Sequence, residues 1–217
     1  IQHPGTEDQY AVDDLSLQSN SGGVGNDWGY FGCFPNPETG LTAGEAQGEV
    51  FELATPPPVS GQQIRITGYG TDSSPPEWNQ IQQTHAGPYV SFSVTTLEYR
   101  TDTTGGTSGS PVIDDNTGLA IGIHTHGGCT SGGGGANRGT GINLLPLQNA
   151  LASPQGVCCS TAACPWDLDS SCDVGIVDFL LLLNVWGSMP GGPPDFDGGG
   201  VGITDFLELL SNWGPCP

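Results

Sequence analysis

Short runs of alternating or β-branched residues, each ended by Gly, Pro, Asn or Asp, fill the chain up to about residue 153. Clear examples are "QIRITGYG" (63–70), "YVSFSVTTLEYR" (89–100), "SPVID" (110–114) and "LAIGIHTH" (119–126). A period of two with turn residues at both ends is typical of β-strands, and 36 Gly and 18 Pro argue against a mostly helical protein. The sequence predicts a mainly β domain, an antiparallel sandwich or barrel, with a short closing helix in "INLLPLQNAL" (142–151).

The net charge and the length of the apolar stretches argue against two classes of partner. Three basic residues stand against 23 acidic ones, a formal net charge of −20, so a nucleic-acid backbone would be repelled. The longest apolar stretch, "FLLLLNVWG" from Phe179, is too short to span a bilayer. We therefore expect neither nucleic-acid nor membrane binding.

The cysteines and the first residues indicate a secreted or cell-surface protein. Seven cysteines, four of them within residues 158–172, fit an oxidising compartment. The opening "IQHPGTEDQY" has no initiator Met and lacks the order of a signal peptide, so we expect the sequence to be part of a longer protein. Cys33 is expected to pair with Cys129 or with an upstream residue, and the five C-terminal cysteines to staple the last part of the chain. Sequence alone leaves these connectivities open.

The chain changes character after residue 152. A Cys- and Ser-rich linker (153–165) leads to "DLDSSCDVGIVDFLLLLNVWG" (167–187) and "DFDGGGVGITDFLELLSNWG" (195–214), which match from their Gly-Ile onward at an offset of 27 residues. Such a repeat means two copies of one supersecondary unit. The predicted domains are therefore 1–152 and 166–217.

Each copy has the form of a calcium-binding loop followed by a helix. In the first copy the oxygen-bearing residues at loop positions 1, 3, 5, 7 and 12 are Asp167, Asp169, Ser171, Asp173 and Asp178. The second copy offers Asp195, Asp197 and Asp205, but it is one residue shorter and has Gly199 where an oxygen ligand is needed. The other interpretation is a pair of solvated turns that cap two helices. We favour calcium for the first loop and leave the second open.

Together the two copies resemble a dockerin-type module, and the tandem "VGIxDFLxLLxxWG" pattern carries the resemblance. The resemblance implies an EF-hand-like pair of calcium loops. It also implies a cohesin-like or cell-surface protein partner for residues 166–217.

The stretch "TDTTGGTSGSPVI" (101–113) offers a nucleophile in a flexible turn. A serine hydroxyl needs a base to take its proton and N–H groups to hold the developing oxyanion. Ser108 can supply the nucleophile, and the amides of Gly106 and Ser108 the two donors, because glycines let the backbone bend around one point.

With "GNDWGYFG" (25–32) and "GLAIGIHTHGG" (118–128), this stretch resembles the trypsin-like serine proteases of the chymotrypsin fold, in particular the bacterial glutamyl endopeptidases. The resemblance implies a chymotrypsin-like barrel with an incomplete first barrel. It makes Ser108 the nucleophile and Asp27 the acid of a Ser-His-Asp triad, with Gly106 in the oxyanion hole. Thr103 and His124 match residues that recognise a glutamate side chain.

The sequence departs from that pattern in three places. Thr107 replaces the usual acid or amide before the nucleophile. Asp102 coincides with the position that recognises lysine and arginine in trypsins and so indicates basic specificity, whereas Thr103 and His124 indicate acidic specificity. We favour acidic specificity. The only histidine before Asp27 is His3, which lacks the expected context, so we expect the catalytic histidine to lie upstream of residue 1.

The other histidines carry weaker signals. His85 is interpreted as a loop residue at a strand entrance. His124 and His126 form an H-x-H pair, but Cys129 alone does not complete a zinc site. We expect no cofactor for catalysis.

Two functions remain. One is a secreted serine endopeptidase acting on peptide substrates, inactive in this fragment without its histidine. The other is a non-catalytic, protease-like scaffold that works in calcium-dependent assembly or adhesion.

Overall fold

The computed structural model describes residues 5–130, 132–158, 164–169 and 173–216, which form two compact units. The first holds the described residues up to Gln9, Gln18–Tyr30 and Pro37–Leu151. The second holds Tyr10–Leu17, Phe31–Asn36 and the described chain from Ala152 onward. His3 lies outside the described residues.

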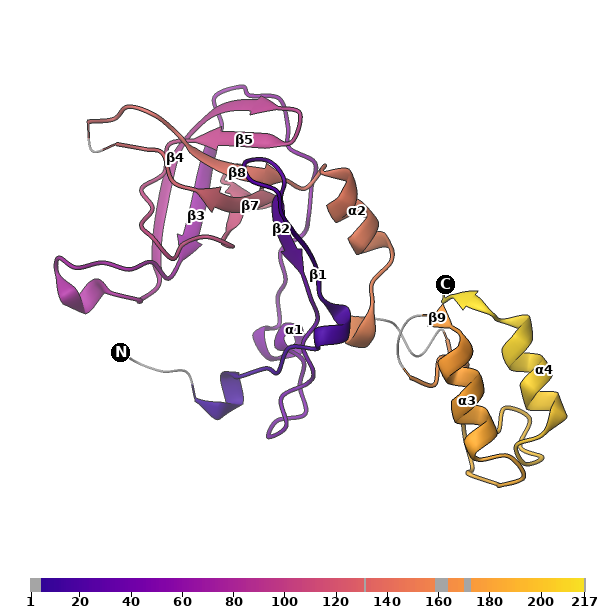
Figure 1. The fold of residues 1–217 in the computed structure, drawn as a ribbon. Coiled ribbons are helices and arrows are strands. Elements are labelled where there is room, and N and C mark those ends of the chain that lie inside the picture. Colours follow the sequence, from indigo (N-terminus) through magenta and orange to yellow (C-terminus); the bar gives the residue numbers. More distant parts are fainter. Residues whose placement is uncertain (1–4, 131, 159–163, 170–172, 217) are drawn as a thin grey trace. The chain divides into compact units, whose positions relative to one another are not determined.

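The centre of the first unit is a closed barrel of six antiparallel strands (Figure 1). Around the ring the order is β3-β4-β5-β8-β7-β6, and β3 pairs with β6 to close it. The strands are β3 (Gln63–Gly68), β4 (Gln83–Ser93), β5 (Thr96–Tyr99), β6 (Pro111–Asp114), β7 (Ala120–His126) and β8 (Asn137–Gly141). The predicted antiparallel barrel is therefore present, although residues 89–100 form two strands joined by a turn at Val94, not one.

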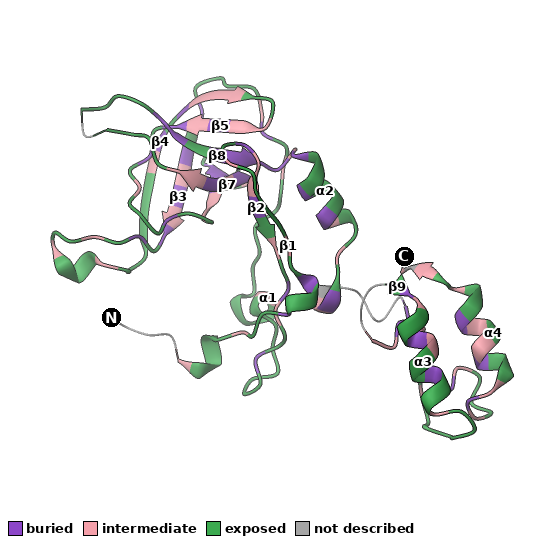
Figure 2. Ribbon diagram, viewed as in Figure 1, coloured by how far each residue is buried: buried purple, intermediate pink, exposed green. Residues whose placement is uncertain are grey.

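Side-chain alternation builds the barrel core. In β3 the buried Ile64 and Ile66 alternate with more exposed neighbours, and Leu97 and Tyr99 alternate in the same way in β5. Figure 2 shows buried stretches along the strands of the barrel. The cluster is completed by residues from β4, β6 and β7, namely Tyr89, Val112 and Ile121. This core fixes the register of the strands that carry the candidate site.

A second apolar cluster joins the chain's early and late parts within the same unit. The hairpin of β1 (Gln18–Ser21) and β2 (Asp27–Tyr30) contributes Trp28, and helix α2 (Leu145–Ala152) contributes Leu147 and Ala150. Pro146 is the second residue of this predicted closing helix, where a missing N–H costs nothing. A short helix, α1 (Ala43–Gln47), starts with a capping box of Thr42 and Glu45. The 3₁₀ turns in the described part of this unit are η1 (Thr6–Asp8) and η3 (Pro76–Trp78).

The second unit contains the two sequence repeats. Helices α3 (Ile176–Asn184) and α4 (Ile203–Ser211) begin and end at equivalent repeat positions. They pack around a core of Cys164, Val174, Leu182, Val201 and Leu209. A disulfide joins Cys164 to Cys216, next to the two-residue ladder of β9 (Asp173–Val174) and β10 (Gly214–Pro215). Nine residues is the greatest helix length in the described ranges, which is too short to cross a membrane.

Hydrogen bonds in the same unit hold the segment of the chain that follows α2. Asp13, in front of η2 (Asp14–Ser16), is buried and accepts a hydrogen bond from Val157 N (2.8 Å) in η4 (Gly156–Cys158). Ser16 accepts one from Gly32 N (2.7 Å).

Of the cysteines with described thiols, Cys33 and Cys129 are free, so the pairing of these two that the sequence allowed is not formed.

Candidate active site and acidic loops

The predicted nucleophile loop is a tight turn between β5 and β6. Thr107 is buried, and both its N–H and its hydroxyl donate to the carbonyl of Thr104. Ser110 N in turn donates to Thr107 O (3.1 Å). The residue that departs from the family pattern thus closes the turn with its own neutral side chain. No buried counter-ion is required at this position.

Ser108 sits exposed at the tip of this turn, and the neighbouring amides are free to bind an anion. Gly106 has a φ of 94° and Gly109 one of 90°, values that L side chains rarely adopt. The carbonyl of Gly105 accepts from Thr71 N (2.7 Å) and Thr71 Oγ1 (2.9 Å). Because a trans peptide directs N–H opposite to C=O, the Gly106 N–H points away from Thr71. Within the described chain neither Gly106 N nor Ser108 N donates a hydrogen bond.

The strand behind the loop ties it to the predicted recognition residue. Gly109 N donates to His124 O (2.8 Å), and His124 N donates to Ser110 O (2.8 Å). The hydroxyl of Ser108 itself donates to Thr125 O (3.3 Å), also in β7. The structure therefore brings Ser108 and His124 onto adjoining segments.

Asp27, the predicted triad acid, is the first residue of β2 and is half-buried. Its backbone is held at both ends by one hydroxyl: Asp27 N donates to Thr140 Oγ1 (3.2 Å), and that hydroxyl donates to Asp27 O (2.8 Å). Thr140 lies in β8, so the hairpin is fixed to the barrel.

The described histidines have partners other than Ser108. His124 Nδ1 contacts Tyr99 Oη, His126 Nδ1 contacts Thr125 Oγ1 (2.8 Å), and His85 Nδ1 accepts from Asp102 N (3.0 Å). Among the residues that the structure describes, none therefore serves as the base for Ser108.

His124 is buried in β7 and bonded to the equally buried Tyr99, with 2.6 Å between His124 Nδ1 and the phenol oxygen. Burial, and next the nearby His126, lower the pKa of His124 to about 4. Burial, followed by the charge of Cys129, raises the pKa of Tyr99. Both groups are neutral at pH 7, and the ring nitrogen Nε2 of His124 is left for another partner.

Thr103 and Asp102, the other two predicted recognition residues, are held by side chains that the sequence did not single out. Thr103 Oγ1 accepts from Asn137 Nδ2 (2.8 Å). His85 is not a loop residue as predicted; it lies in β4 and fixes the Asp102 amide. Sequence patterns indicated nothing for Asn137, whose bonds to Thr101 and Thr103 span 36 and 34 residues of the chain.

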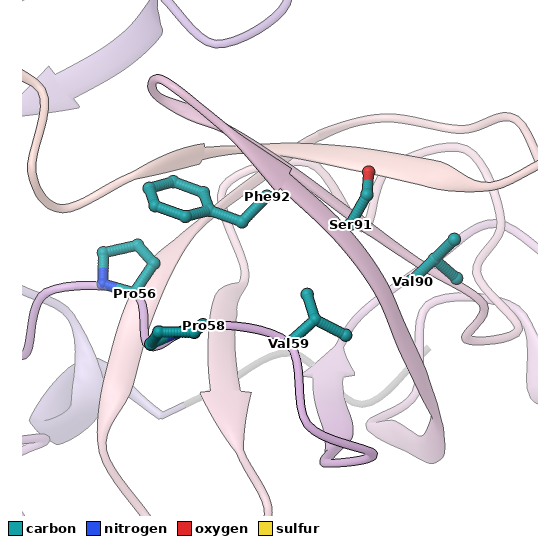
Figure 3. A pocket seen from close by; sticks show the side chains of 6 residues that line it. All are labelled: Pro56, Pro58, Val59, Val90, Ser91 and Phe92. Carbon is teal, nitrogen blue, oxygen red and sulfur yellow. The ribbon is translucent and has the colours of Figure 1, made fainter.

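Two of the cavities in the described part of the chain lie along barrel strands. One of about 180 Å³ is polar and lies next to the nucleophile loop, with His85, Asp102, Thr103, Thr107 and Asp72 among its lining residues. The other, about 480 Å³, is lined by Pro56, Pro58, Val59, Val90, Ser91 and Phe92 (Figure 3). None of the predicted site residues lines this second cavity, and its one hydroxyl, that of Ser91, already donates to Glu98 Oε2 (2.8 Å).

Each C-terminal repeat brings three carboxylates together. The groups are Asp167, Asp169 and Asp178, and Asp195, Asp197 and Asp205, with ligand atoms in each group within 4.8 Å of one another. Asp173 is exposed at the start of β9, and Ser171 lies outside the described residues.

The last carboxylate of each group lies in the first turn of its helix and accepts hydrogen bonds from the preceding loop and from the N-cap. Asp178 accepts from Leu168 N (2.6 Å) and Gly175 N (2.7 Å), and Asp205 accepts from Phe196 N (2.7 Å) and Gly202 N (2.8 Å). Burial would raise the pKa of Asp205, but these backbone donors outweigh it and hold the pKa below its ordinary value. The carboxylate therefore stays charged.

Comparison with known proteins supports the protease-like half. Residues 39–123 match the trypsin-like peptidase domain. Glutamyl endopeptidase of Bacillus licheniformis is 32% identical over 97 residues, which cover 41% of this chain and 28% of that protein. The chain thus spans less than a third of the length of this curated relative.

One solved structure supports the fold. A thermostable serine protease, AL20, from an extremophilic microorganism matches with a TM-score of 0.51 at 19% identity, over 65% of both chains. A Glu endopeptidase in complex with MPD covers 66% of this chain and 60% of its own, with 20% identity and a TM-score of 0.49. The AL20 structure and the family match indicate a chymotrypsin-like, trypsin-type serine protease fold for the first unit, with sequence similarity to a glutamyl endopeptidase.

Proposed function

We propose that this chain is part of a secreted serine endopeptidase that cleaves peptide bonds by acyl transfer through Ser108. The observation that carries the proposal is the turn around Ser108. It exposes the hydroxyl beside the backbone N–H groups of Gly106 and Ser108, which donate no hydrogen bond within the described chain. Asp27 would orient the catalytic base. That base, a histidine, would come from a segment outside these 217 residues.

We further propose a preference for substrates with an acidic side chain before the scissile bond. His124 is neutral and offers Nε2, and Thr103 offers a hydroxyl, so each has a group that can donate to a carboxylate. Asp102 is exposed and its amide is held by His85 on the side of the polar cavity. An extracellular location fits the Cys164–Cys216 disulfide.

The experiment restores the missing base chemically. The chain alone should react slowly with a fluorophosphonate probe, and added imidazole should raise the labelling rate at Ser108 because a free base can take the hydroxyl proton. A complete gene product that includes the upstream histidine should label fast without imidazole. Ser108→Ala should abolish labelling, whereas Ser110→Ala, two residues away, should keep it.

The alternative is a non-catalytic scaffold, and one observation favours it: Ser108 Oγ donates to a backbone carbonyl, not to a base. Absence of labelling both with imidazole and in the complete gene product would support the scaffold and exclude the peptidase.

We propose that the C-terminal module binds calcium, and the donor chemistry fits. Hard carboxylate oxygens converge in each loop, and residues 153–217 contain no Lys, Arg or His to neutralise them. In the first loop Asp167, Asp169 and Asp178 would hold the ion, and in the second Asp195, Asp197 and Asp205. Calcium would supply the missing positive charge and stabilise the loops.

We also propose that the module docks on a cohesin-like or cell-surface protein. Equivalent residues of the two helices leave apolar side chains exposed, for example Leu180 and Leu207, at 55% and 58%. Leu180→Lys with Leu207→Lys should abolish binding to cohesin domains, whereas Val94→Lys, an exposed change in the other unit, should not. Unchanged binding by the double variant, or none by the wild type, would contradict this partner.

A further inference from the structure

Asn137, the first residue of β8, has a side chain with every hydrogen-bonding position filled. It is 1% exposed. Its Nδ2 donates to Thr101 O (2.7 Å) and Thr103 Oγ1 (2.8 Å), and its Oδ1 accepts from Gly128 N (2.8 Å) and Cys129 N (3.0 Å). An asparagine amide has two donor hydrogens and two acceptor lone pairs, so all are used.

These partners also fix which end of the amide is which. Gly128 N and Cys129 N can only donate, and Thr101 O can only accept. A flipped amide would place donors against donors and an acceptor against an acceptor. The orientation follows from the surrounding backbone.

The amide therefore joins two segments that are far apart in sequence. Thr101 and Thr103 lead into the nucleophile loop, and Gly128 and Cys129 follow β7, which carries His124. A buried, fully satisfied polar group of this kind specifies one arrangement of its neighbours, because any other leaves a buried group unpaired.

The bond to Thr103 sets the direction of that hydroxyl. Its oxygen accepts from Asn137, and in the described part of the chain its hydrogen is donated to nothing. A hydroxyl that already accepts a bond is polarised toward donating one. Thr103 is thereby prepared as a donor.

We propose that Asn137 is a positioning residue for acid recognition: it holds the two segments of the specificity pocket together and makes the Thr103 hydroxyl a donor to a substrate carboxylate. This inference rests on the proposed peptidase function and deepens it. A glutamate carboxylate can accept from such donors with two charged oxygens, whereas glutamine can accept with only one neutral oxygen.

The test measures binding, so it does not need the catalytic base. Two peptides with one sequence, ending in Glu or in Gln, are titrated into the 217-residue chain by calorimetry. The wild type should bind the Glu peptide roughly tenfold or more tightly, the range expected for hydrogen bonds to a charged group. Asn137→Asp and Thr103→Val should bring the Glu-to-Gln ratio close to one, and Thr103→Ser should restore it.

The matched control is Asn143→Asp. Asn143 follows β8 as well, but its Nδ2 donates to Val94 O (2.8 Å) and not to any pocket residue. This variant should keep the wild-type ratio. Thermal melts of each variant show whether it is folded.

The outcomes distinguish a failure of acidic specificity from a failure of the role of Asn137. If the wild type does not distinguish Glu from Gln, acidic specificity fails and the role of Asn137 with it. If the wild type distinguishes them and folded Asn137→Asp does so equally, the role of Asn137 is overturned while acidic specificity stands. If Asn137→Asp does not fold, Thr103→Val decides, since an unchanged ratio there overturns the proposal.

Discussion

The phenol oxygen of Tyr99 lies 2.6 Å from Nδ1 of His124, with both side chains buried inside the barrel wall. The same hydroxyl is 3.5 Å from the carbonyl of Arg138, so the histidine is the closer partner. A neutral imidazole that accepts at Nδ1 carries its proton at Nε2. With the Tyr99 hydroxyl as donor to Nδ1, we expect His124 to carry its proton on Nε2 and to donate from there.

We expect nitrogen NMR to find His124 as the Nε2–H tautomer at pH 7. Tyr99→Phe removes the hydroxyl and should give a mixture of tautomers, because Nδ1 then has no donor. His85, whose Nδ1 accepts from Asp102 N, is an internal control that Tyr99→Phe should leave unchanged. A wild-type spectrum with the proton on Nδ1 would contradict the assignment.

We expect the free energy of unfolding to fall as the pH is lowered, because His124 binds a proton more readily in the unfolded chain. Its pKa is about 4 in the folded protein and 6.5 in the unfolded chain, so the unfolded state binds the proton first. The stabilisation is complete above pH 6.5 and is lost as the pH falls toward 4, by roughly 3 kcal/mol. Urea unfolding at a series of pH values measures it.

His124→Gln provides the reference for this pH effect. It keeps an acceptor for Tyr99 but cannot titrate, so subtracting its profile removes the contribution of the many carboxylates. Parallel profiles of wild type and variant between pH 4 and 6.5 would show that His124 titrates normally.

Gly139→Ala should disturb the same pair. A Cβ at Gly139 would lie 2.6 Å from Ile123 O and 3.3 Å from Tyr99 Oη, and the backbone carbonyl cannot move aside cheaply. We expect a loss of about 2 kcal/mol of unfolding free energy. Gly127→Ala, at a position with nothing within 4 Å, should change it by less than about 0.5 kcal/mol. Equal effects of the two changes would contradict the close packing.

Calcium should stabilise the C-terminal module. Melting followed by circular dichroism and by the fluorescence of Trp186 and Trp213 should move to higher temperature from chelator to millimolar calcium. Asp167→Asn with Asp195→Asn should reduce the shift because each loop loses a charge. Glu77→Gln, in the other unit, should leave it intact. Identical melts with and without calcium in the wild type would rule the site out.

Sequence patterns were enough for β3 and β5, whose side chains alternate between a buried and a more exposed face, and for β6 and β7, which are short apolar runs bounded by turn residues. They missed β8, because "NRGTG" has little intrinsic preference for a strand and becomes one by pairing on both sides with β5 and β7. The turn at Val94 was missed as well, since a φ of 56° at a β-branched residue is not expected from sequence.

In the candidate site, too, the residues in short motifs were predicted and the residues that depend on distant partners were not. Ser108, Gly106 and His124 stand in short motifs with a chemical reason for each residue. Asn137 and Tyr99 do not, because their roles depend on partners brought close only by the folded barrel. A polar residue at the start of an unrecognised strand gives no local sign of such contacts.

Closure of the ring between β3 and β6 makes the pocket register a property of the whole barrel. A slip of β8 by one residue against β7 would turn Asn137 to the opposite face, and in an open sheet an edge strand could do this alone. Here every strand has two neighbours, so one slip requires matching slips around the circle. The proposed recognition site is thereby held in place by the closed topology, so we expect that mutations on the far strands can loosen it without changing any of its residues.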